Sequence, residues 1–265
     1  MSLQVVVNFK VIEESADWIV VNKPAPLIVH PANRKPEPTL LGGLKMLLAY
    51  EIATGARLAF VNRLDRETSG VVLVAKTTAA ASELGCIFER REVKKEYLAI
   101  VVGWPEMDNW ECREPLLRTG VTIESQIWVR QQVHEAGRPC HTQFRVEKRF
   151  ERDGSKFALL RCFPETGRMH QIRVHLAHTG FPIVGDKLYL HDGQEYVDWM
   201  AHGWNAKLEK ILLLPRHALH AASLELRWHG KAMRWEAPLP QDLREFSTGE
   251  VVAPTPDIVI WCRHD

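Results

Sequence analysis

A short loop of alternating charges is the first place where this sequence could do chemistry. Asp65 stands between Arg63 and Arg66 and is followed by Thr68-Ser69-Gly70, directly before a continuous apolar run. Neighbouring guanidinium groups favour the ionised form of a carboxyl, and this form acts as a nucleophile or a general base. An ordinary turn with an ion-paired aspartate explains the same residues, so the segment alone leaves both interpretations open.

A second candidate is Tyr97, which lies in an alternating apolar segment over residues 94–103. A tyrosine beside a cleft can stack on a nucleobase and still offer its hydroxyl group. A tyrosine at the edge of the hydrophobic core is the simpler explanation of the spacing. The segment therefore predicts a strand but does not by itself predict a site.

A third candidate is the segment 165–176, in which Thr166-Gly167 is expected to open a helix. Its first turns carry Arg168, His170 and Arg173, and His170 and Arg173 share a face because they are three residues apart. A helix N-terminus with arginines is suited to holding a carboxylate or a phosphate. The segment predicts an anion-binding surface.

Two other chemistries are disfavoured by spacing. His170, His175 and His178 have no nearby Cys and no H-E-x-x-H pattern, so we expect no metal site. Ser69 lacks the first glycine of the G-x-S-x-G motif, which argues against a hydrolase nucleophile.

The composition is that of an ordinary globular protein. The 265 residues are 46% hydrophobic and 25% charged, which excludes a disordered or low-complexity chain. The 34 Lys and Arg nearly balance the 33 Asp and Glu, so any nucleic-acid binding needs a local basic patch. Residues 138–187 hold ten basic and five acidic residues, and residues 236–265 hold two and six. The basic middle fits a phosphate-binding surface and equally fits a solvated sheet face.

The positioning elements are expected to form a mixed, largely antiparallel α+β sheet. Thr39 and Thr77 are expected to cap two helices, and Asp153-Gly154 is expected to join two strands as a hairpin turn. The predicted strands are 5–11, 18–21, 70–76, 95–102, 126–133, 142–150, 157–163 and 219–228, and the predicted helices are 40–48, 78–91, 169–178 and 195–213.

The sequence also favours a cytoplasmic protein that is not attached to a membrane. Apolar runs such as Val71–Ala75 are far shorter than the ~18 residues of a membrane span. The N-terminus lacks the charged and apolar regions of a secretion signal. The five Cys are odd in number and show no C-x-x-C spacing, which fits a reducing compartment.

Taken together, four separated segments resemble the RluA-type RNA pseudouridine synthases of the RluA/RsuA superfamily. They are residues 17–31, the Asn62–Gly70 loop, the strand 94–103, and the segment 166–176 with Gly185-Asp186 and Leu219-His220-Ala221. The similarity runs over roughly residues 11–245 and keeps the family's order. It implies an α+β fold whose largely antiparallel sheet forms a central cleft flanked by helices and loops.

The resemblance assigns roles to matching positions. Asp65 matches the catalytic aspartate, Tyr97 the residue that packs on the flipped base, and Arg173 the arginine that pairs with the aspartate. Leu219 matches an apolar residue of the base pocket, and Arg63 matches the arginine that enters the RNA stack. Arg168 and His170 are expected to bind RNA.

The implied activity is isomerisation of specific uridines to pseudouridine in structured RNA, either rRNA or tRNA, by base flipping. The resemblance implies no cofactor and no metal, and we expect a monomer. A non-catalytic RNA-binding protein on the same fold is the alternative.

The sequence departs from the family pattern at a few places. Asn62 stands where the family usually has His, and Pro26 where Gly is common. Residues 191–213 form a longer link than usual. We expect one catalytic domain over residues 1–246, a C-terminal extension over 247–265, and no S4 domain, because about 17 residues before the first motif are too few for one.

Overall fold

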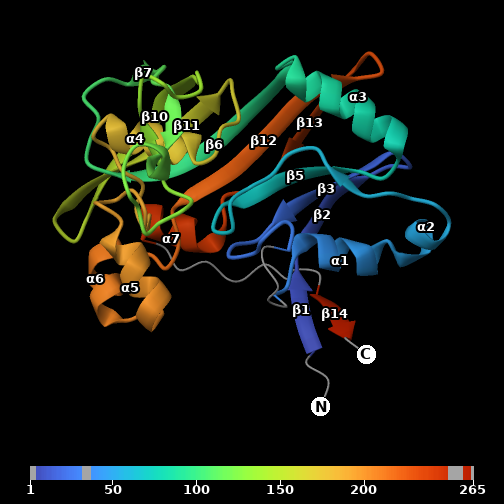
Figure 1. Ribbon diagram of the computed structural model, residues 1–265, viewed down its shortest axis with the longest axis horizontal. Coiled ribbons are helices and arrows are strands. Elements are labelled where there is room, and N and C mark those ends of the chain that lie inside the picture. Colours follow the sequence, from blue (N-terminus) through green and yellow to red (C-terminus); the bar gives the residue numbers. More distant parts are fainter. Residues whose placement is uncertain (1–3, 32–36, 250–258, 264–265) are drawn as a thin grey trace. The chain divides into compact units, whose positions relative to one another are not determined.

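The computed structural model describes residues 4–31, 37–249 and 259–263 (Figure 1). The chain divides into two compact units. Unit 1 comprises Met1–Lys94, Ala221–Gln241 and Val251–Asp265, and unit 2 comprises Lys95–His220 and Asp242–Glu250. Strands β6 (Val93–Val102) and β12 (Leu219–Trp228) each begin in one unit and end in the other.

Unit 1 is built on an antiparallel sheet. Its strands follow the order β2 (Lys10–Glu14), β3 (Trp18–Lys23), β5 (Ser69–Ala75) and β12, with β13 (Lys231–Glu236) paired to β12 and β4 (Ala59–Phe60) paired to β5. A separate pair joins β1 (Gln4–Asn8) to β14 (Val259–Arg263). The helices are α1 (Leu40–Leu47), α2 (Ala49–Ala53) and α3 (Thr78–Glu89).

The core of unit 1 follows from its apolar runs. Every residue of β5 is buried, as expected for a central strand covered on both faces. Ala80 and Leu84 of α3 pack into the cluster that contains Leu73 and Trp235. The Thr39 and Thr77 side chains accept hydrogen bonds from the backbone N–H groups of Gly42 and Ala80, so both predicted helix caps are confirmed.

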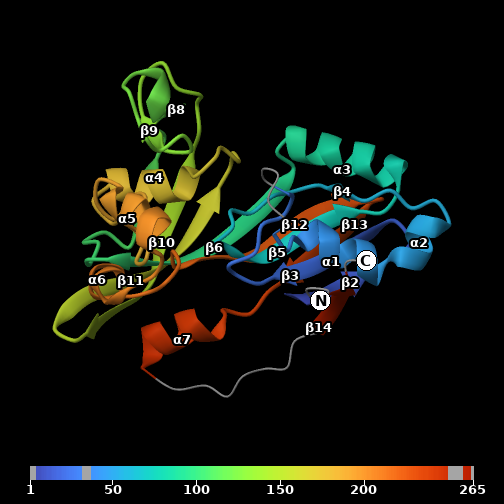
Figure 2. The same ribbon diagram turned by 60° about the horizontal axis from the view of Figure 1, so that its bottom comes forward.

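Unit 2 has a second antiparallel arrangement. Its strands follow the order β6, β11 (Ser155–Pro164), β10 (Thr142–Arg152) and β7 (Asn109–Cys112). The predicted hairpin at Asp153-Gly154 joins β10 to β11. A small pair, β8 (Leu116–Arg118) and β9 (Gln131–Val133), projects from the end of unit 2 that carries α4 (Figure 2).

The described part of unit 2 also contains the helices α4 (Gln171–His178), α5 (Gln194–His202), α6 (Ala206–Leu212) and α7 (Gln241–Thr248), and a 3-10 turn over Thr119–Val121. Only Gln241 of α7 belongs to unit 1. Wherever the register between two of these strands is defined, the two strands are antiparallel. The predicted α+β class with a largely antiparallel sheet is confirmed.

Two predicted elements are wrong in extent. The strand 126–133 is reduced to β9, because the Ser125 hydroxyl accepts a hydrogen bond from the Ile127 N–H and a turn follows. The helix 195–213 is two helices, since Gly203 has a φ of +70° and the Asn205 side chain caps α6.

Two other predicted elements differ in where they break or begin. The strand 5–11 is interrupted at Phe9, where β1 and β2 separate. The helix after Thr166-Gly167 begins at Gln171, because His170 adopts a left-handed φ of +56°. Within the described ranges no helix is both long and apolar enough to cross a bilayer.

Candidate active site

Asp65 lies in the loop between β4 and β5 of unit 1. The residue is half-buried, its neighbours Arg63 and Arg66 are exposed, and Leu64 packs inward. The Thr68 N–H donates to the Asp65 carbonyl oxygen at 3.1 Å, which closes a turn around the carboxylate. The Arg66 guanidinium lies 3.7 Å from the Glu37 carboxylate. The loop thus presents an acidic side chain on a tight turn that enters a buried strand.

Asn62 fixes the start of this loop to strand β5. Its side-chain amide donates to the Val71 carbonyl oxygen at 3.1 Å, and its Oδ1 accepts from the Leu73 N–H at 2.8 Å. One donor and one acceptor are also what a neutral imidazole offers. Asparagine at this position therefore supplies two directed contacts to the strand, although the family usually has histidine here.

Lys23 supports the Asp65 loop, a role that we did not predict from the sequence. It is fully buried, and its ammonium group donates to the carbonyl oxygens of Pro24, Leu27 and Arg66 at 3.0, 2.8 and 3.2 Å. A buried charge is costly without hydrogen-bond partners, and three carbonyls satisfy its three protons. The Leu27 N–H also donates to the Arg66 carbonyl oxygen at 2.9 Å. Lys23 thereby ties the segment after β3 to the Asp65 loop.

Gly70 and Ser69 end the loop at the wall of the sheet. A Cβ at Gly70, whose φ is +116°, would lie 2.1 Å from the Ala221 carbonyl oxygen on β12. Only glycine fits so close an approach of two strands. The Ser69 side chain is buried within this packing, which is a poor place for a hydrolase nucleophile.

Arg173 on α4 forms a buried bidentate ion pair with Asp186 in unit 2. Its Nε and Nη2 donate to Oδ2 and Oδ1 at 2.7 and 2.8 Å. Oδ1 also accepts from the N–H groups of Leu188 and Tyr189 at 3.0 and 3.2 Å. The Arg173 guanidinium carbon lies 5.0 Å from the centre of the Tyr189 ring. Arg173 is therefore held rigidly, and Asp186 is a supporting residue whose role was not predicted.

The residues around this pair are joined to β6 by backbone hydrogen bonds. The Ile100 N–H donates to the Ala218 carbonyl oxygen at 3.0 Å, and the Ile100 carbonyl oxygen accepts from Val184 at 3.0 Å. Tyr97 lies on the same strand and is half-buried, and Leu219 follows Ala218 and is buried. Unit 2 thus places Tyr97, Leu219 and the Arg173–Asp186 pair on neighbouring connected segments.

Arg168 and His170 lie in the loop that leads into α4. The Arg168 N–H donates to the Gln171 side-chain oxygen at 3.0 Å, and its Nε contacts the Pro139 carbonyl oxygen at 3.4 Å. His170 Nδ1 lies 2.7 Å from the Tyr189 hydroxyl, which also accepts from the Gln131 N–H at 2.9 Å. Tyr189 therefore connects this loop to β9.

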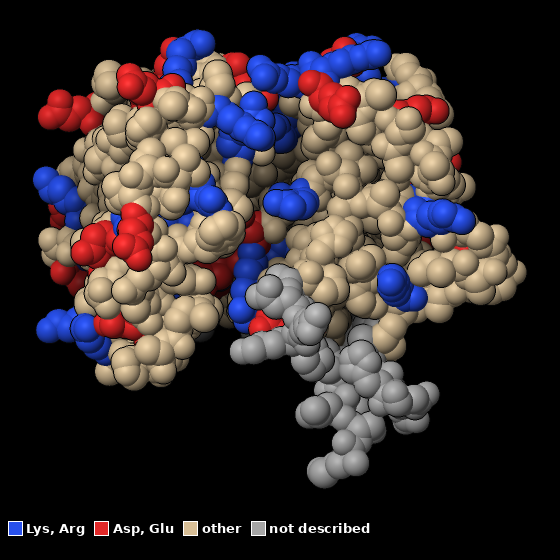
Figure 3. Space-filling model, viewed as in Figure 1, with Lys and Arg blue, Asp and Glu red and all other residues tan. Residues whose placement is uncertain are grey.

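Five of the ten basic residues in the stretch 138–187 form ion pairs with nearby carboxylates. On the face seen in Figure 3, acidic side chains lie among the Lys and Arg of unit 2. The ion pairs are Arg145–Glu147, Arg149–Asp108, Arg152–Asp153, Arg161 with Glu96 and Glu147, and Arg173–Asp186. Arg168 lies outside these ion pairs, and its contact with an RNA phosphate stays a prediction.

His175 of α4 makes hydrogen bonds of a structural kind. His175 is buried, and its ring nitrogens contact the Thr142 hydroxyl at 3.0 Å and the Glu114 carbonyl oxygen at 2.9 Å. Burial lowers the pKa of His175, which favours the neutral ring. Among the residues that the structure describes, no cluster of three or more His, Cys, Asp or Glu side chains could hold a metal ion.

The predicted site residues therefore fall into two groups. Asp65 and Arg63 belong to unit 1, whereas Tyr97, Arg168, His170, Arg173 and Leu219 belong to unit 2. Within each unit the predicted residues lie on loops, strands or, for Arg173, a helix, and directed contacts hold these segments in place. Pairing of Arg173 with Asp65 stays a prediction.

Comparisons with known proteins agree on one family. A family model described as RNA pseudouridylate synthase matches residues 17–178. The chain is 37% identical over 243 residues to the ribosomal large subunit pseudouridine synthase D of Nitrosomonas europaea, covering 89% of this chain and 64% of that protein. It is also 37% identical over 245 residues to the protein of the same name from Escherichia coli O6:H1, covering 89% and 68%. The chain thus spans about two thirds of the length of these relatives.

Solved structures show the same fold. Human RNA Pseudouridylate Synthase Domain Containing 4 superposes with a TM-score of 0.67 at 24% identity, covering 89% of this chain and 90% of that one. Human RNA Pseudouridylate Synthase Domain Containing 1 gives a TM-score of 0.62 at 24% identity, covering 94% and 97%. From the match to the family model and the relatives at 37% identity, the chain belongs to the RNA pseudouridine synthase family.

Proposed function

We propose that this protein is an RNA pseudouridine synthase that isomerises specific uridines in structured RNA. The observation that carries the proposal is the family match over residues 17–178, which includes Asp65, Tyr97 and Arg173. The relatives at 37% identity are named for the ribosomal large subunit, so ribosomal RNA is the substrate class that we favour over tRNA.

The proposed chemistry fits the residue types. Isomerisation breaks the N1–C1′ bond, turns the base and joins C5 to C1′, so no atoms are gained and no electrons are lost overall. A carboxylate at Asp65 would start this by attack on the sugar or by removing a proton from it. Tyr97 would hold the detached base, and Leu219 would line its pocket. Asp65, fixed by the contacts of Lys23 and Asn62 to its loop, would be ready without rearrangement.

RNA binding would prepare the target nucleotide. A base inside a stacked helix must leave the stack before its sugar and ring can be reached. Arg63 is exposed next to Asp65 and would fill the vacated position. Arg168 and His170 would contact the RNA backbone. We also propose that the protein works as a monomer in the cytoplasm, and light scattering of the purified chain without RNA tests the oligomeric state.

The test follows the hydrogen at C5 of uridine, which leaves when C5 joins the sugar. Ribosomal RNA and tRNA labelled with tritium at C5 are incubated with the wild type, with Asp65→Asn and with Asp153→Asn. Asp153 lies in the exposed β10–β11 turn and serves as the matched control. We expect tritium release by the wild type and the control but not by Asp65→Asn. Release by all three proteins, or by none on either RNA, would contradict the proposal.

The alternative, a non-catalytic RNA-binding protein on the same fold, predicts RNA binding without tritium release. Under this alternative, Tyr97→Ala would change the affinity for RNA and no other property.

A further inference from the structure

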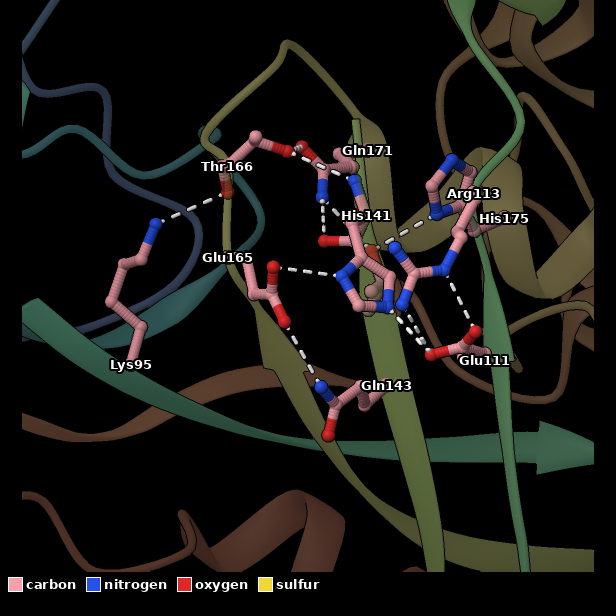
Figure 4. Close-up of polar contacts among 10 residues, drawn as sticks. Lys95, Glu111, Arg113, His141, Gln143, Glu165, Thr166, Gln171 and His175 are labelled. Carbon is pink, nitrogen blue, oxygen red and sulfur yellow. Dashed lines mark hydrogen bonds and ion pairs between the residues drawn. The ribbon is translucent and has the colours of Figure 1, made fainter. Parts of the chain in front are cut away.

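His141 lies at the centre of a polar cluster in unit 2 that the proposed chemistry does not use. It directly precedes β10, and only 10% of its side chain is exposed. Its Nε2 lies 2.9 Å from Oε2 of Glu111 on β7, and its Nδ1 lies 2.8 Å from Oε2 of Glu165 in the loop before α4 (Figure 4). The Nδ1 contact is an ion pair by distance and not a directed hydrogen bond. One imidazole therefore faces two carboxylates.

The imidazole lies between two carboxylates that other groups also stabilise in the ionised form. The Arg113 guanidinium, followed by His141, lowers the pKa of Glu111 to about 2, and His141 is the main cause of the lowered pKa of Glu165. The ring therefore joins strand β7 to the loop before α4 through one carboxylate on each side.

Other polar groups around the ring bind the same two carboxylates. Directly after β7, Arg113 donates to Glu111 at 2.7 and 3.1 Å. From β10, the Gln143 amide donates to Glu165 at 3.0 Å. From α4, His175 interacts electrostatically with His141, and burial lowers the pKa of His175. Each carboxylate that His141 faces thus has a second partner that helps to orient it.

The backbone of His141 also holds the loop, independently of the ring. Its carbonyl oxygen accepts from the Glu165 N–H at 3.1 Å and from the Gln171 amide at 2.9 Å, and its N–H donates to the Thr166 hydroxyl at 3.2 Å. Gln171 in turn accepts from the Arg168 N–H at 3.0 Å. Losing the ring contact would therefore loosen the Glu165 end of the loop without detaching it.

We propose that His141 is a positioning residue whose ring fixes the 165–170 loop by bridging Glu111 and Glu165, so that the affinity for RNA through Arg168 and His170 depends on these two contacts. This inference rests on the proposed function, because it assigns the loop to RNA binding. We expect His141 to affect the affinity for RNA but not the rate of turnover, because the Arg173–Asp186 pair lies outside the cluster and has its own contacts.

The test compares KM and kcat for RNA in the wild type, His141→Gln, Glu165→Gln and the double variant. We expect each variant to raise KM about two- to fivefold, the effect of one partly exposed ion pair. We expect kcat to stay unchanged and the double variant to equal the single ones, because all three remove the same contact.

Two controls sharpen the result. His229→Gln removes another histidine–glutamate ion pair, the 2.9 Å contact with Glu83 in unit 1, and should leave KM unchanged. His141→Lys keeps a nitrogen donor between the two carboxylates and should retain a low KM. Urea unfolding of each variant identifies any general loss of structure.

Several results would overturn the inference. They are an unchanged KM in His141→Gln, a fall in kcat with constant KM, and additive effects of His141→Gln and Glu165→Gln. If the wild type releases no tritium, the proposed function fails. Filter-binding measurements of Kd with the same variants and RNA then decide the inference alone.

Discussion

The buried Arg173–Asp186 pair makes the sharpest prediction about stability. Asp186 is fully buried, and the Arg173 side chain is 6% exposed. One Asp186 oxygen accepts from Arg173, Leu188 and Tyr189, and the other accepts from Arg173 alone. Asp186→Asn keeps the size of the side chain and one oxygen. Its new NH₂ group must face either the arginine Nε–H or the three remaining donors.

The expected cost follows from this geometry. The substitution removes the negative charge that neutralises the guanidinium in unit 2 and replaces one acceptor by a donor. Breaking a buried ion pair by changing one partner costs about 3–5 kcal/mol. With a urea m-value of about 2–3 kcal/mol/M, the midpoint of the Asp186→Asn variant should fall by about 1–2 M.

Asp242→Asn is the matched control. Asp242 on α7 accepts two hydrogen bonds from Arg216 at 2.6 and 2.9 Å, but its side chain is 40% exposed. Water screens this pair and can solvate the asparagine, so we expect a cost of about 1 kcal/mol or less. The two substitutions are chemically identical and differ in the burial of the carboxylate.

Equilibrium urea unfolding, followed by tryptophan fluorescence at neutral pH, measures both costs. If the two variants lose equal stability, or if Asp186→Asn loses less, burial does not determine the strength of the pair and the reasoning is refuted. We also expect Asp186→Asn to reduce tritium release at saturating RNA by at least tenfold, because Arg173 loses its fixed orientation.

Three further predictions concern other positions. Asn62→Ala should lower kcat with little effect on KM in the tritium assay, because the start of the Asp65 loop loses its two contacts to β5, and an unchanged kcat would contradict this role. Gly70→Ala should give little folded protein by circular dichroism, because the new Cβ would lie 2.1 Å from the Ala221 carbonyl oxygen, whereas Gly154→Ala, with no atom within 4 Å of its Cβ, should fold. The pKa of Glu111 is lowered to about 2, chiefly by Arg113, so its contribution to stability is present above the unfolded pKa of about 4.5 and is lost as pH falls toward 2. Wild type should therefore lose more stability than Glu111→Gln between about pH 5 and about pH 3 in urea titrations, and parallel losses would contradict the assignment.

Local chemistry made part of the fold predictable. Thr39 and Thr77 precede apolar periodic runs, and each caps its helix through its own side chain. The Asp153-Gly154 turn lies between two alternating runs, and it joins β10 to β11. These features depend on residues close in sequence, so patterns in the sequence suffice to find them.

Other elements depend on distant partners. β13 becomes a strand because it pairs with β12, and α7 packs Phe246 against Phe150 and Phe157 on the β10–β11 hairpin. The longer helix expected over 195–213 breaks at Gly203, and a single glycine in a periodic run does not by itself reveal a break. Pattern reasoning had no signal for these outcomes.

The same division applies to the candidate site. The motifs pointed to the family and to Asp65, Tyr97 and Arg173, because these residues match the family's motifs in the family's order along the chain. Only the tertiary structure decided what holds them: the buried ammonium of Lys23 against the Asp65 loop, Asp186 against Arg173, and His141 between two glutamates. Arg173 and Asp186 are 13 residues apart along the chain, and Lys23 and Arg66 are 43 residues apart. A charge is stable in the interior only where folding brings such a distant partner to it.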